Sequence, residues 1–295
     1  MDTLIIEKKN EVYLTVDCDP NVQRELSEFF TFYVPGYKFM PAFRNRMWDG
    51  KIRLFSQKTK EIYFGLFPYI KAFAEEREYH IVCGKDVEVK NKVDKDIVEK
   101  FSNSLGQKFE ARDYQVDAIY HSLKYNRALL LSPTASGKSF IIYALIRYYT
   151  HLIKDETNNR ILLIVPTTSL VEQMYSDFKS YGWNVEKNCH RLYSGYSNQT
   201  DKKVLISTWQ SLYKLPKEYF DQFGVVFGDE AHLFKSKSLT EIMSKLIDCK
   251  YRIGLTGTLD GAQTHKLVLE GLFGAVNKVT STRKLMDKQQ LSNLV

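Results

Sequence analysis

The chain has 295 residues, of which 44% are hydrophobic and 26% charged, and its formal net charge is +7. This length and composition predict one or two well-packed domains and exclude wholesale disorder. The four cysteines are far apart and form no C-x-x-C pair, which argues against a zinc site or a disulfide framework and favours a reducing cytosol. No stretch approaches the length of a membrane span, so we expect no membrane partner.

Residues 1–105 predict a small α+β domain. Alternating polarity indicates a strand at 11–16, and further strands are expected at 61–67 and 80–89. Helices are expected at 20–32 and 68–79, each with a proline in its first turn. A helix-like segment at 94–104 then precedes the predicted domain boundary.

A basic hairpin is predicted inside this domain, because Asp49-Gly50 separates two strand-like runs at 43–48 and 51–55. Residues 36–60 hold seven basic side chains against one acid. Alternation places these side chains together on one face of each arm: Arg44, Arg46 and Trp48, then Lys51 and Arg53. Such a surface is a candidate nucleic-acid contact. The alternative is a solvated outer face with Trp48 packed against the helices.

A phosphate-binding loop is predicted at Ser132-Pro-Thr-Ala-Ser-Gly-Lys-Ser139, between an apolar strand at 128–131 and a helix at 139–149. The first N–H groups of such a helix point at a bound anion. Gly137 lets the backbone approach closely, Lys138 would reach the β- and γ-phosphates, and the Ser139 hydroxyl would bind Mg²⁺. Ser132 stands where the usual pattern has its first glycine. The alternative is an ordinary strand-to-helix turn with a surface lysine.

A second acidic segment, Asp229-Glu-Ala-His232, follows the apolar run 223–227. Carboxylates at the carboxyl end of a parallel strand lie where α/β sheets bind ligands. Asp229 would hold Mg²⁺ and Glu230 would polarise the attacking water. The alternative is a solvated acidic pair beside a surface imidazole, His232. Found together, the two segments predict nucleoside triphosphate hydrolysis.

From residue 111 onward strands and helices alternate, which is typical of a doubly wound, mostly parallel sheet. The expected strands are 128–131, 161–165, 185–193, 204–207, 225–228 and 252–255. Together with the two segments above, this predicts a P-loop NTPase fold of the α/β class, preceded by the small α+β domain.

Six segments in order resemble the first RecA-like domain of superfamily 2 helicases and translocases. They are Arg112-Asp-Tyr-Gln115, the phosphate loop, Val165-Pro-Thr-Thr-Ser-Leu-Val-Glu-Gln173, Ile206-Ser-Thr-Trp-Gln-Ser211, Asp229-Glu-Ala-His232 and Thr256-Gly-Thr258. The whole chain, basic domain included, resembles a DNA helicase of T-even phages. The resemblance implies a nucleic-acid-binding domain at 1–105, a RecA-like domain at 106–280, and at 281–295 the passage to a second RecA-like domain.

The resemblance also implies roles for individual residues. Arg112 and Gln115 match the element that reads adenine, so ATP is the expected nucleotide with Mg²⁺ as its metal. Residues matching the phosphate and magnesium site are Thr134, Ala135, Ser136, Gly137, Lys138, Ser139, Asp229 and Glu230. Residues matching the coupling and single-strand-tracking segments are His232, Thr256 and Thr258, then Pro166, Thr167 and Thr208. Ser132, Ala135 and the Thr-Gly-Thr segment depart from the commoner family pattern. The alternative for Thr208 is a plain helix cap.

The expected function is an ATP-dependent DNA helicase or branch-remodelling translocase acting in recombination, repair and replication. Its expected partners are single-stranded, duplex or branched DNA, with RNA–DNA hybrids as a further candidate, in the cytoplasm of the host if phage-encoded. A second RecA-like domain is expected in cis, because it would supply an arginine to the phosphoryl transfer, and residues 1–295 alone are expected to hydrolyse ATP poorly. The alternatives are an RNA helicase, a duplex translocase, or a non-enzymatic nucleic-acid-binding module.

Overall fold

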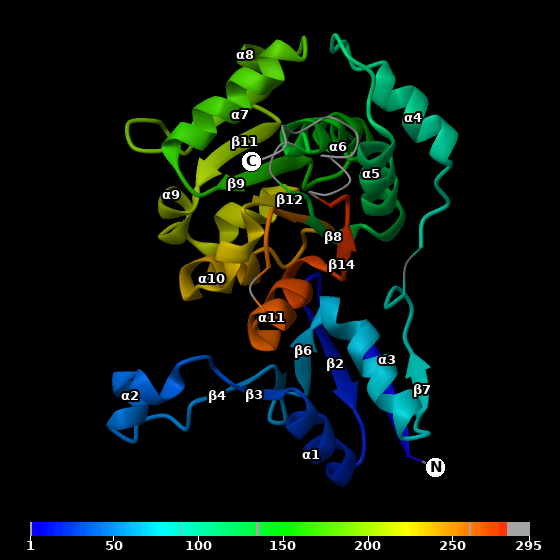
Figure 1. The fold of residues 1–295 in the computed structure, drawn as a ribbon, viewed down its shortest axis with the longest axis vertical. Helices are drawn as coiled ribbons and strands as arrows, with labels where there is room; N and C mark the ends of the chain where they lie inside the picture. Colours follow the sequence, from blue (N-terminus) through cyan, green and yellow to red (C-terminus); the bar gives the residue numbers. More distant parts are fainter. Residues whose placement is uncertain (1, 89, 134–135, 260, 282–295) are drawn as a thin grey trace, which may run out of the picture. The chain divides into compact units, whose positions relative to one another are not determined.

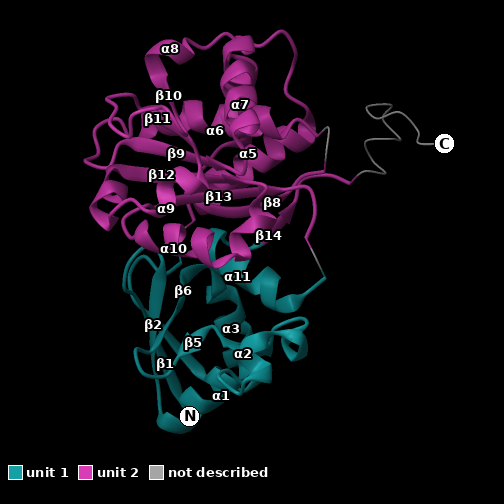
Figure 2. Ribbon diagram, turned by 90° about the vertical axis from the view of Figure 1, so that its left-hand side faces the viewer, with its two compact units in different colours: residues 1–89, 260–275 teal, residues 90–259, 276–295 magenta. Residues whose placement is uncertain are grey.

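The computed structural model describes residues 2–88, 90–133, 136–259 and 261–281, and the chain divides into two compact units. Unit 1 comprises residues 1–89 and 260–275, and unit 2 comprises residues 90–259 and 276–295 (Figure 2). This division differs from the predicted one in two places. Residues 90–105 group with unit 2, because Val98 and Leu105 belong to its hydrophobic core. The segment 260–275, predicted as part of the RecA-like domain, groups with unit 1.

Unit 1 is built on a five-stranded sheet in the order β5-β6-β2-β1-β7 (Figure 1). Its strands are β1 (Thr3–Lys8), β2 (Tyr13–Asp17), β5 (Phe55–Ser56), β6 (Glu61–Tyr63) and β7 (His80–Cys83). Only β1 and β7 run parallel; the other neighbours are antiparallel. The helices are α1 (Pro20–Phe29), the short η2 (Phe64–Leu66) and α3 (Phe67–Glu76). Asp19 caps α1 through the Asn21 N–H, and Pro20 occupies its first turn, as the sequence predicts.

Unit 1 is completed by α11 (Gln263–Phe273), which comes from far along the chain. The Tyr69 hydroxyl of α3 donates a hydrogen bond of 2.5 Å to the buried Glu270 carboxylate. Gly65 lies against the backbone of α11 so closely that a Cβ atom on it would be 1.9 Å from the Glu270 carbonyl oxygen. The chain thus leaves unit 2 after Leu259, forms a helix of unit 1, and returns at Val276.

The predicted basic hairpin is wrong. Its first arm is not a strand: α2 (Pro41–Arg44) forms there, and Arg46 adopts a left-handed conformation with φ 56°. The second arm is β4 (Lys51–Arg53), which pairs antiparallel with β3 (Thr31–Tyr33) instead. The physical reason is local, since Pro41 suits the first turn of a helix. Asp49-Gly50 still marks a tight bend, but this bend leads into β4 from an irregular segment.

Unit 2 contains a seven-stranded, wholly parallel sheet in the order β10-β11-β9-β12-β13-β8-β14. Its strands are β8 (Arg127–Leu131), β9 (Arg160–Val165), β10 (Cys189–Leu192), β11 (Val204–Thr208), β12 (Phe223–Asp229), β13 (Tyr251–Thr256) and β14 (Val276–Lys278). All seven residues of β12 are buried, as in a central strand covered on both faces. This is the doubly wound α/β sheet that the alternation predicts.

Helices cover both faces of this sheet (Figures 1 and 2). They are α4 (Lys95–Asn103), α5 (Asp113–Tyr125), α6 (Lys138–Leu152), α7 (Thr168–Ser180), α8 (Val185–Asn188), α9 (Trp209–Tyr213) and α10 (Lys237–Lys245), with η3 (Lys217–Gln222) and η4 (Ala231–Lys235). α5, α6 and α7 share one core with the sheet, whereas α9 and α10 pack together on the opposite face. The predicted strand 185–193 is partly wrong, because Asn184 caps α8 and the strand β10 begins only at Cys189.

No helix in the described part of the chain combines the length and the apolar character that crossing a bilayer requires.

Candidate functional site

The predicted phosphate loop joins the end of β8 to the start of α6. The Ser132 N–H donates to the Thr256 carbonyl oxygen of the neighbouring β13 at 2.8 Å, which anchors the loop at the sheet edge. Gly137 adopts a left-handed conformation with φ 78°, and a Cβ atom there would lie 2.4 Å from the Gln115 Nε2 atom. Only glycine satisfies both conditions without strain. Thr134 and Ala135, predicted nucleotide contacts, lie outside the described residues.

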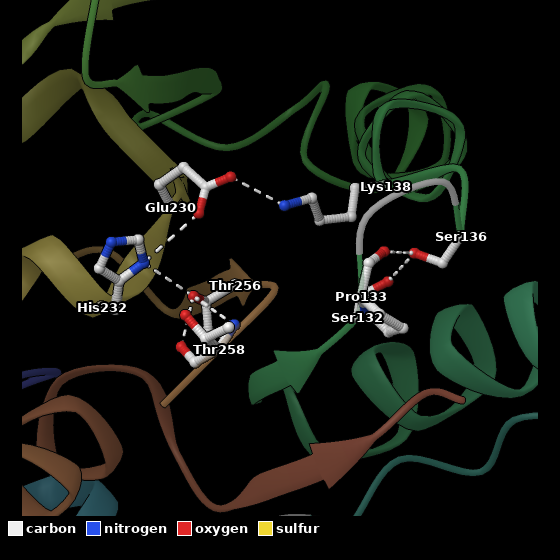
Figure 3. Close-up of polar contacts among 8 residues, drawn as sticks. All are labelled: Ser132, Pro133, Ser136, Lys138, Glu230, His232, Thr256 and Thr258. Carbon is white, nitrogen blue, oxygen red and sulfur yellow. Dashed lines mark hydrogen bonds and ion pairs between the residues drawn. The ribbon is translucent and has the colours of Figure 1, made fainter. Parts of the chain in front are cut away.

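Ser132, which departs from the family pattern, has a structural role in the loop (Figure 3). Its hydroxyl lies 2.5 Å from the Ser136 hydroxyl, and the Ser136 hydroxyl donates to the Pro133 carbonyl oxygen at 2.6 Å. Both serine side chains are fully buried. These contacts restrain Ser132 and Ser136 relative to each other, and a glycine at position 132 could not form the hydroxyl–hydroxyl contact.

Gln115 ties the loop to the start of α5. Its side-chain amide donates to the Ser136 carbonyl oxygen at 3.0 Å and accepts from the Arg112 N–H at 3.0 Å. The Arg112 guanidinium donates to the Tyr114 hydroxyl at 2.7 Å. Arg112 and Gln115, the predicted adenine-reading pair, are thus brought next to the phosphate loop; that they contact adenine stays a prediction.

The acidic segment lies opposite the loop, at the end of β12. Glu230 adopts a left-handed conformation with φ 50°, and its Oε1 atom lies 2.9 Å from the Lys138 Nζ atom. The structure therefore pairs two residues 92 positions apart in the sequence (Figure 3). A non-glycine residue in this conformation costs free energy, and such strain is concentrated at functional sites.

Asp229 is 3% exposed, and one of its carboxylate oxygens, Oδ1, has no hydrogen-bond partner among the described residues. Burial raises the pKa of this carboxyl, while the charge on Lys138 opposes that rise. An unpartnered buried carboxylate oxygen beside a phosphate loop fits Mg²⁺, which is a hard cation that takes few carboxylates. The residues present therefore fit a nucleotide-bound magnesium ion, with Asp229 as the carboxylate that would hold it.

The predicted coupling residues form one hydrogen-bonded chain behind Glu230. The Thr256 hydroxyl donates to the Thr258 carbonyl oxygen at 2.8 Å, so its oxygen is available to accept from His232 Nδ1 at 2.9 Å. The same His232 nitrogen lies 3.4 Å from Glu230 Oε2. A displacement of the Glu230 carboxylate would therefore change the position of His232 and, with it, the hydrogen bond to Thr256 at the end of β13.

Ser139, the second predicted magnesium ligand, has a partner that the sequence did not suggest. Its hydroxyl lies 2.9 Å from the Tyr181 hydroxyl. Burial raises the pKa of the half-buried Asp177, and the nearby Ser139 hydroxyl opposes the rise. Asp177 and Tyr181 are four residues apart at the end of α7, so helical spacing places them on one face, but nothing in the sequence connects that face to the phosphate loop.

The predicted track residues gather at the carboxyl ends of adjacent strands. Thr208 at the end of β11 is paired in register with Val165 at the end of β9, which Pro166 and Thr167 follow. The Thr167 hydroxyl accepts from the Leu170 N–H at 3.3 Å and caps α7. Thr208 is the first residue before α9 but makes no hydrogen bond to the helix backbone; its hydroxyl lies 3.2 Å from that of Ser211. The alternative that Thr208 is a plain helix cap is therefore supported only by its position before α9 and not by a hydrogen bond from its side chain to the helix backbone.

The four basic residues predicted to contact nucleic acid are not on one hairpin face: Arg44 ends α2, Arg46 follows that helix, and Lys51 and Arg53 lie on β4. Arg53 pairs with Asp49, and the Trp48 indole N–H donates to the Lys51 carbonyl oxygen at 2.9 Å. Lys51 lies over the Tyr33 ring at 4.9 Å. Arg44, Arg46, Trp48 and Asp49 line a shallow hollow of about 570 Å³ with Lys38, Phe43 and Met47.

We expect Asp229→Asn to stabilise the chain in the absence of nucleotide. A carboxyl whose pKa is raised by folding is destabilising when ionised, so at neutral pH its neutralisation should increase the free energy of unfolding by about 1 kcal/mol. The difference between the two proteins should shrink as the pH falls and Asp229 in the parent takes up its proton. Thermal unfolding at a series of pH values measures this; an unchanged or growing difference at low pH would contradict it. Stabilisation by Mg²⁺ with ATP should be lost in the variant.

Residues 108–261, more than half of the chain, match the family model described as "Type III restriction enzyme, res subunit", and residues 6–84 match the model "DNA helicase UvsW, N-terminal". The chain belongs to the first of these families and is a superfamily 2 helicase-type protein with a RecA-like α/β fold. The resemblance predicted from the six segments is confirmed.

The chain is 34% identical over 291 residues to the ATP-dependent DNA helicase uvsW of Enterobacteria phage T4, covering 96% of this chain and 57% of that protein. It is 28% identical over 158 residues to the DNA 3'-5' translocase XPB2 of Sulfurisphaera tokodaii, covering 52% of this chain and 32% of that protein. The crystal structure of the UvsW helicase from Bacteriophage T4 matches with a TM-score of 0.85 at 33% identity, over 94% of this chain and 100% of that one. The chain thus spans 57% of the length of the T4 helicase.

Proposed function

We propose that this chain supplies the first motor domain and the DNA-binding domain of an ATP-dependent DNA helicase or branch-remodelling translocase that acts in recombination, repair and replication. The observation that carries the proposal is the pairing of Lys138 with Glu230 at 2.9 Å, beside an Asp229 oxygen that has no partner in the part of the chain that the structure describes. These three side chains come from the phosphate loop and from the end of β12, and each has the chemistry that its predicted role requires. The likeness to the T4 helicase over 96% of the chain supports DNA as the substrate.

Each residue of the site has a separate role in hydrolysis. Lys138 leaves Glu230 to bind the β- and γ-phosphates, and the released Glu230 carboxylate orients the attacking water and accepts its proton. Asp229 and Ser139 would hold Mg²⁺, which when bound offsets the negative charge of the phosphate oxygens. Ser139 has to exchange its contact with Tyr181 for this role.

Nucleotide state reaches DNA through the contact of Glu230 with His232 and the hydrogen bonds from His232 to Thr256 and from Thr256 to Thr258. His232 and Thr256 link the site to the end of β13, while Pro166, Thr167 and Thr208 lie along the single-strand track at the ends of β9 and β11. In unit 1, Arg44, Arg46, Trp48, Lys51 and Arg53 contribute to duplex or branched DNA binding. A second RecA-like domain in cis completes the nucleotide site, and the protein acts in the host cytoplasm if it is phage-encoded like the T4 relative.

A duplex translocase that does not separate strands is the second candidate. The match to a DNA 3'-5' translocase over 52% of the chain favours it. Strand-displacement assays on forked DNA distinguish the two, because a translocase would hydrolyse ATP on duplex DNA and release no strand.

The nucleotide site can be tested in this chain without turnover. Lys138→Ala should weaken binding of a fluorescent ATP analogue with Mg²⁺ by about 10- to 100-fold, since a hydrogen bond to a charged group contributes roughly 1.5–3 kcal/mol. Lys154→Ala, an exposed lysine in the same unit, is the matched control and should bind as the parent does. Equal affinities for the parent and Lys138→Ala would reject this site.

A further inference from the structure

Two large apolar side chains of unit 1 are almost fully exposed: Phe39 at 84% and Met47 at 81%. Among the described residues no other large apolar side chain exceeds 64%. Both belong to the segment 34–50 between β3 and β4, which we call the excursion. Phe39 ends η1 (Tyr37–Phe39) and Met47 follows α2. Exposed apolar side chains held on an ordered segment are typical of a binding surface.

The excursion is ordered by its own contacts. The Val34 N–H donates to the Gly50 carbonyl oxygen at 2.9 Å and closes its base. The Tyr37 ring packs directly on Gly50, where a Cβ atom would lie 2.2 Å from it, and stacks on the Tyr33 ring at 4.7 Å. The Met47 N–H donates to the Ala42 carbonyl oxygen at 2.9 Å. Phe39 and Met47 therefore stay exposed because the aromatic contacts inside the excursion are made by other side chains.

Positive charge surrounds these two side chains. Lys38 precedes Phe39, and Arg44 and Arg46 both precede Met47 in the sequence. Lys38, Arg44, Arg46 and Met47 also line the same hollow. In the described part of the chain no acidic side chain forms an ion pair with Lys38, Arg44 or Arg46 within 4 Å, whereas Arg53 is paired with Asp49. Cations without acidic partners are available for phosphates.

Apolar and cationic groups on one short segment match the two surfaces of DNA, the base faces and the phosphates. Inserted Phe and Met side chains stack on bases or wedge between base steps, and unstacking a continuous duplex costs a few kcal/mol per step. At a branch point or a duplex end, the face of the last base pair is already exposed, so that cost is small. The combination therefore favours branched DNA over continuous duplex.

We infer that the excursion is a branch-recognition element, in which Phe39 and Met47 stack on the base pair exposed at a DNA branch while Lys38, Arg44 and Arg46 hold the flanking phosphates. This inference rests on the proposed DNA-binding function and specifies which DNA structure unit 1 selects and how.

The test compares binding of this chain to a three-way junction and to a linear duplex of equal length, with 2-aminopurine placed at the branch pair or within an arm. The Phe39→Ala/Met47→Ala variant should lose the preference for the junction by about 5- to 100-fold, because stacking on one base contributes roughly 1–3 kcal/mol. It should also lose most of the 2-aminopurine signal change at the branch. Linear duplex affinity and its salt dependence should stay as in the parent.

Two comparison variants make the outcome specific. Arg44→Ala/Arg46→Ala should weaken binding to both DNAs alike and reduce the slope of log affinity against log salt by about 2. Ile97→Ala, an exposed apolar side chain on α4 of unit 2, should change nothing. All four substituted residues of unit 1 are exposed, so the fold should persist, as circular dichroism would verify.

An unchanged junction preference and an unchanged 2-aminopurine response in Phe39→Ala/Met47→Ala would overturn the inference while leaving DNA binding intact. A loss of binding to anionic lipid vesicles by that variant, with DNA binding unaffected, would overturn it in favour of a membrane surface. If the parent and the arginine variant both fail to bind any DNA, the proposed DNA-binding function of unit 1 fails as well.

Discussion

In a protein that carries both RecA-like domains, Glu230→Gln should lower the rate of ATP hydrolysis by about 10²- to 10⁴-fold, the usual contribution of a positioned general base. The glutamine side chain keeps the shape of glutamate and can still accept a hydrogen bond from Lys138, but it cannot take a proton from water. In the proposed site Lys138 leaves Glu230, its partner here, when nucleotide binds, and a neutral glutamine would release it more easily. Affinity for Mg²⁺ with ATP should therefore be retained or improved.

Phosphate release in the presence of DNA measures the rate of ATP hydrolysis. Titration with a fluorescent ATP analogue measures nucleotide affinity separately. Glu218→Gln, an exposed glutamate in η3 of the same unit, is the control and should match the parent in both. Retained turnover in Glu230→Gln would remove Glu230 as the base. Loss of nucleotide binding would instead make the Lys138–Glu230 pair a structural support of the loop.

Gly65→Ala should destabilise unit 1 by about 1–3 kcal/mol or more, the range for overpacking a close contact. The added methyl group would lie 1.9 Å from the Glu270 carbonyl oxygen and 2.8 Å from that of Gly271, and both are backbone atoms that cannot rotate away. Relief requires α11 to move off η2, which would also separate Glu270 from Tyr69.

Hydrogen exchange measured by mass spectrometry should show faster exchange in α11 and η2, with β8 to β13 of unit 2 unchanged. Gly261→Ala is the matched control, because a Cβ atom there meets nothing within 4 Å. If exchange rates in α11 were the same in the parent and in Gly65→Ala, the close packing of α11 in unit 1 would be refuted.

The parts of the fold that the sequence predicts correctly are those with long apolar runs. β8, β9 and β12 are strands buried on both faces, and such strands are apolar along most of their length. Because parallel strands end at one edge, the position of Asp229 opposite the phosphate loop also follows from the sequence. The pairing of Lys138 with Glu230 is compatible with this prediction but depends on the left-handed backbone of Glu230, which no pattern indicates.

The parts that could not be predicted depend on competing local signals or on distant contacts. Strand-like alternation at 43–48 competes with Pro41, which favours a helix, and the short segment carries too little burial to decide between them. Ser139 and Tyr181 are 42 residues apart and meet only because α6 and α7 pack together. The apolar helix at Gln263–Phe273 would be compatible with either core, so its sequence does not assign it to unit 1.

The path of α11 has a consequence for how such proteins can change over evolutionary time. A domain that is merely fused to the front of an enzyme can be exchanged by one cut and one join in the gene. Here the helix that completes unit 1 is encoded between two strands of the motor sheet, β13 and β14, so a cut near residue 89 would separate unit 1 from part of its own core. A hybrid that exchanges unit 1 between relatives must therefore exchange residues 260–275 as well.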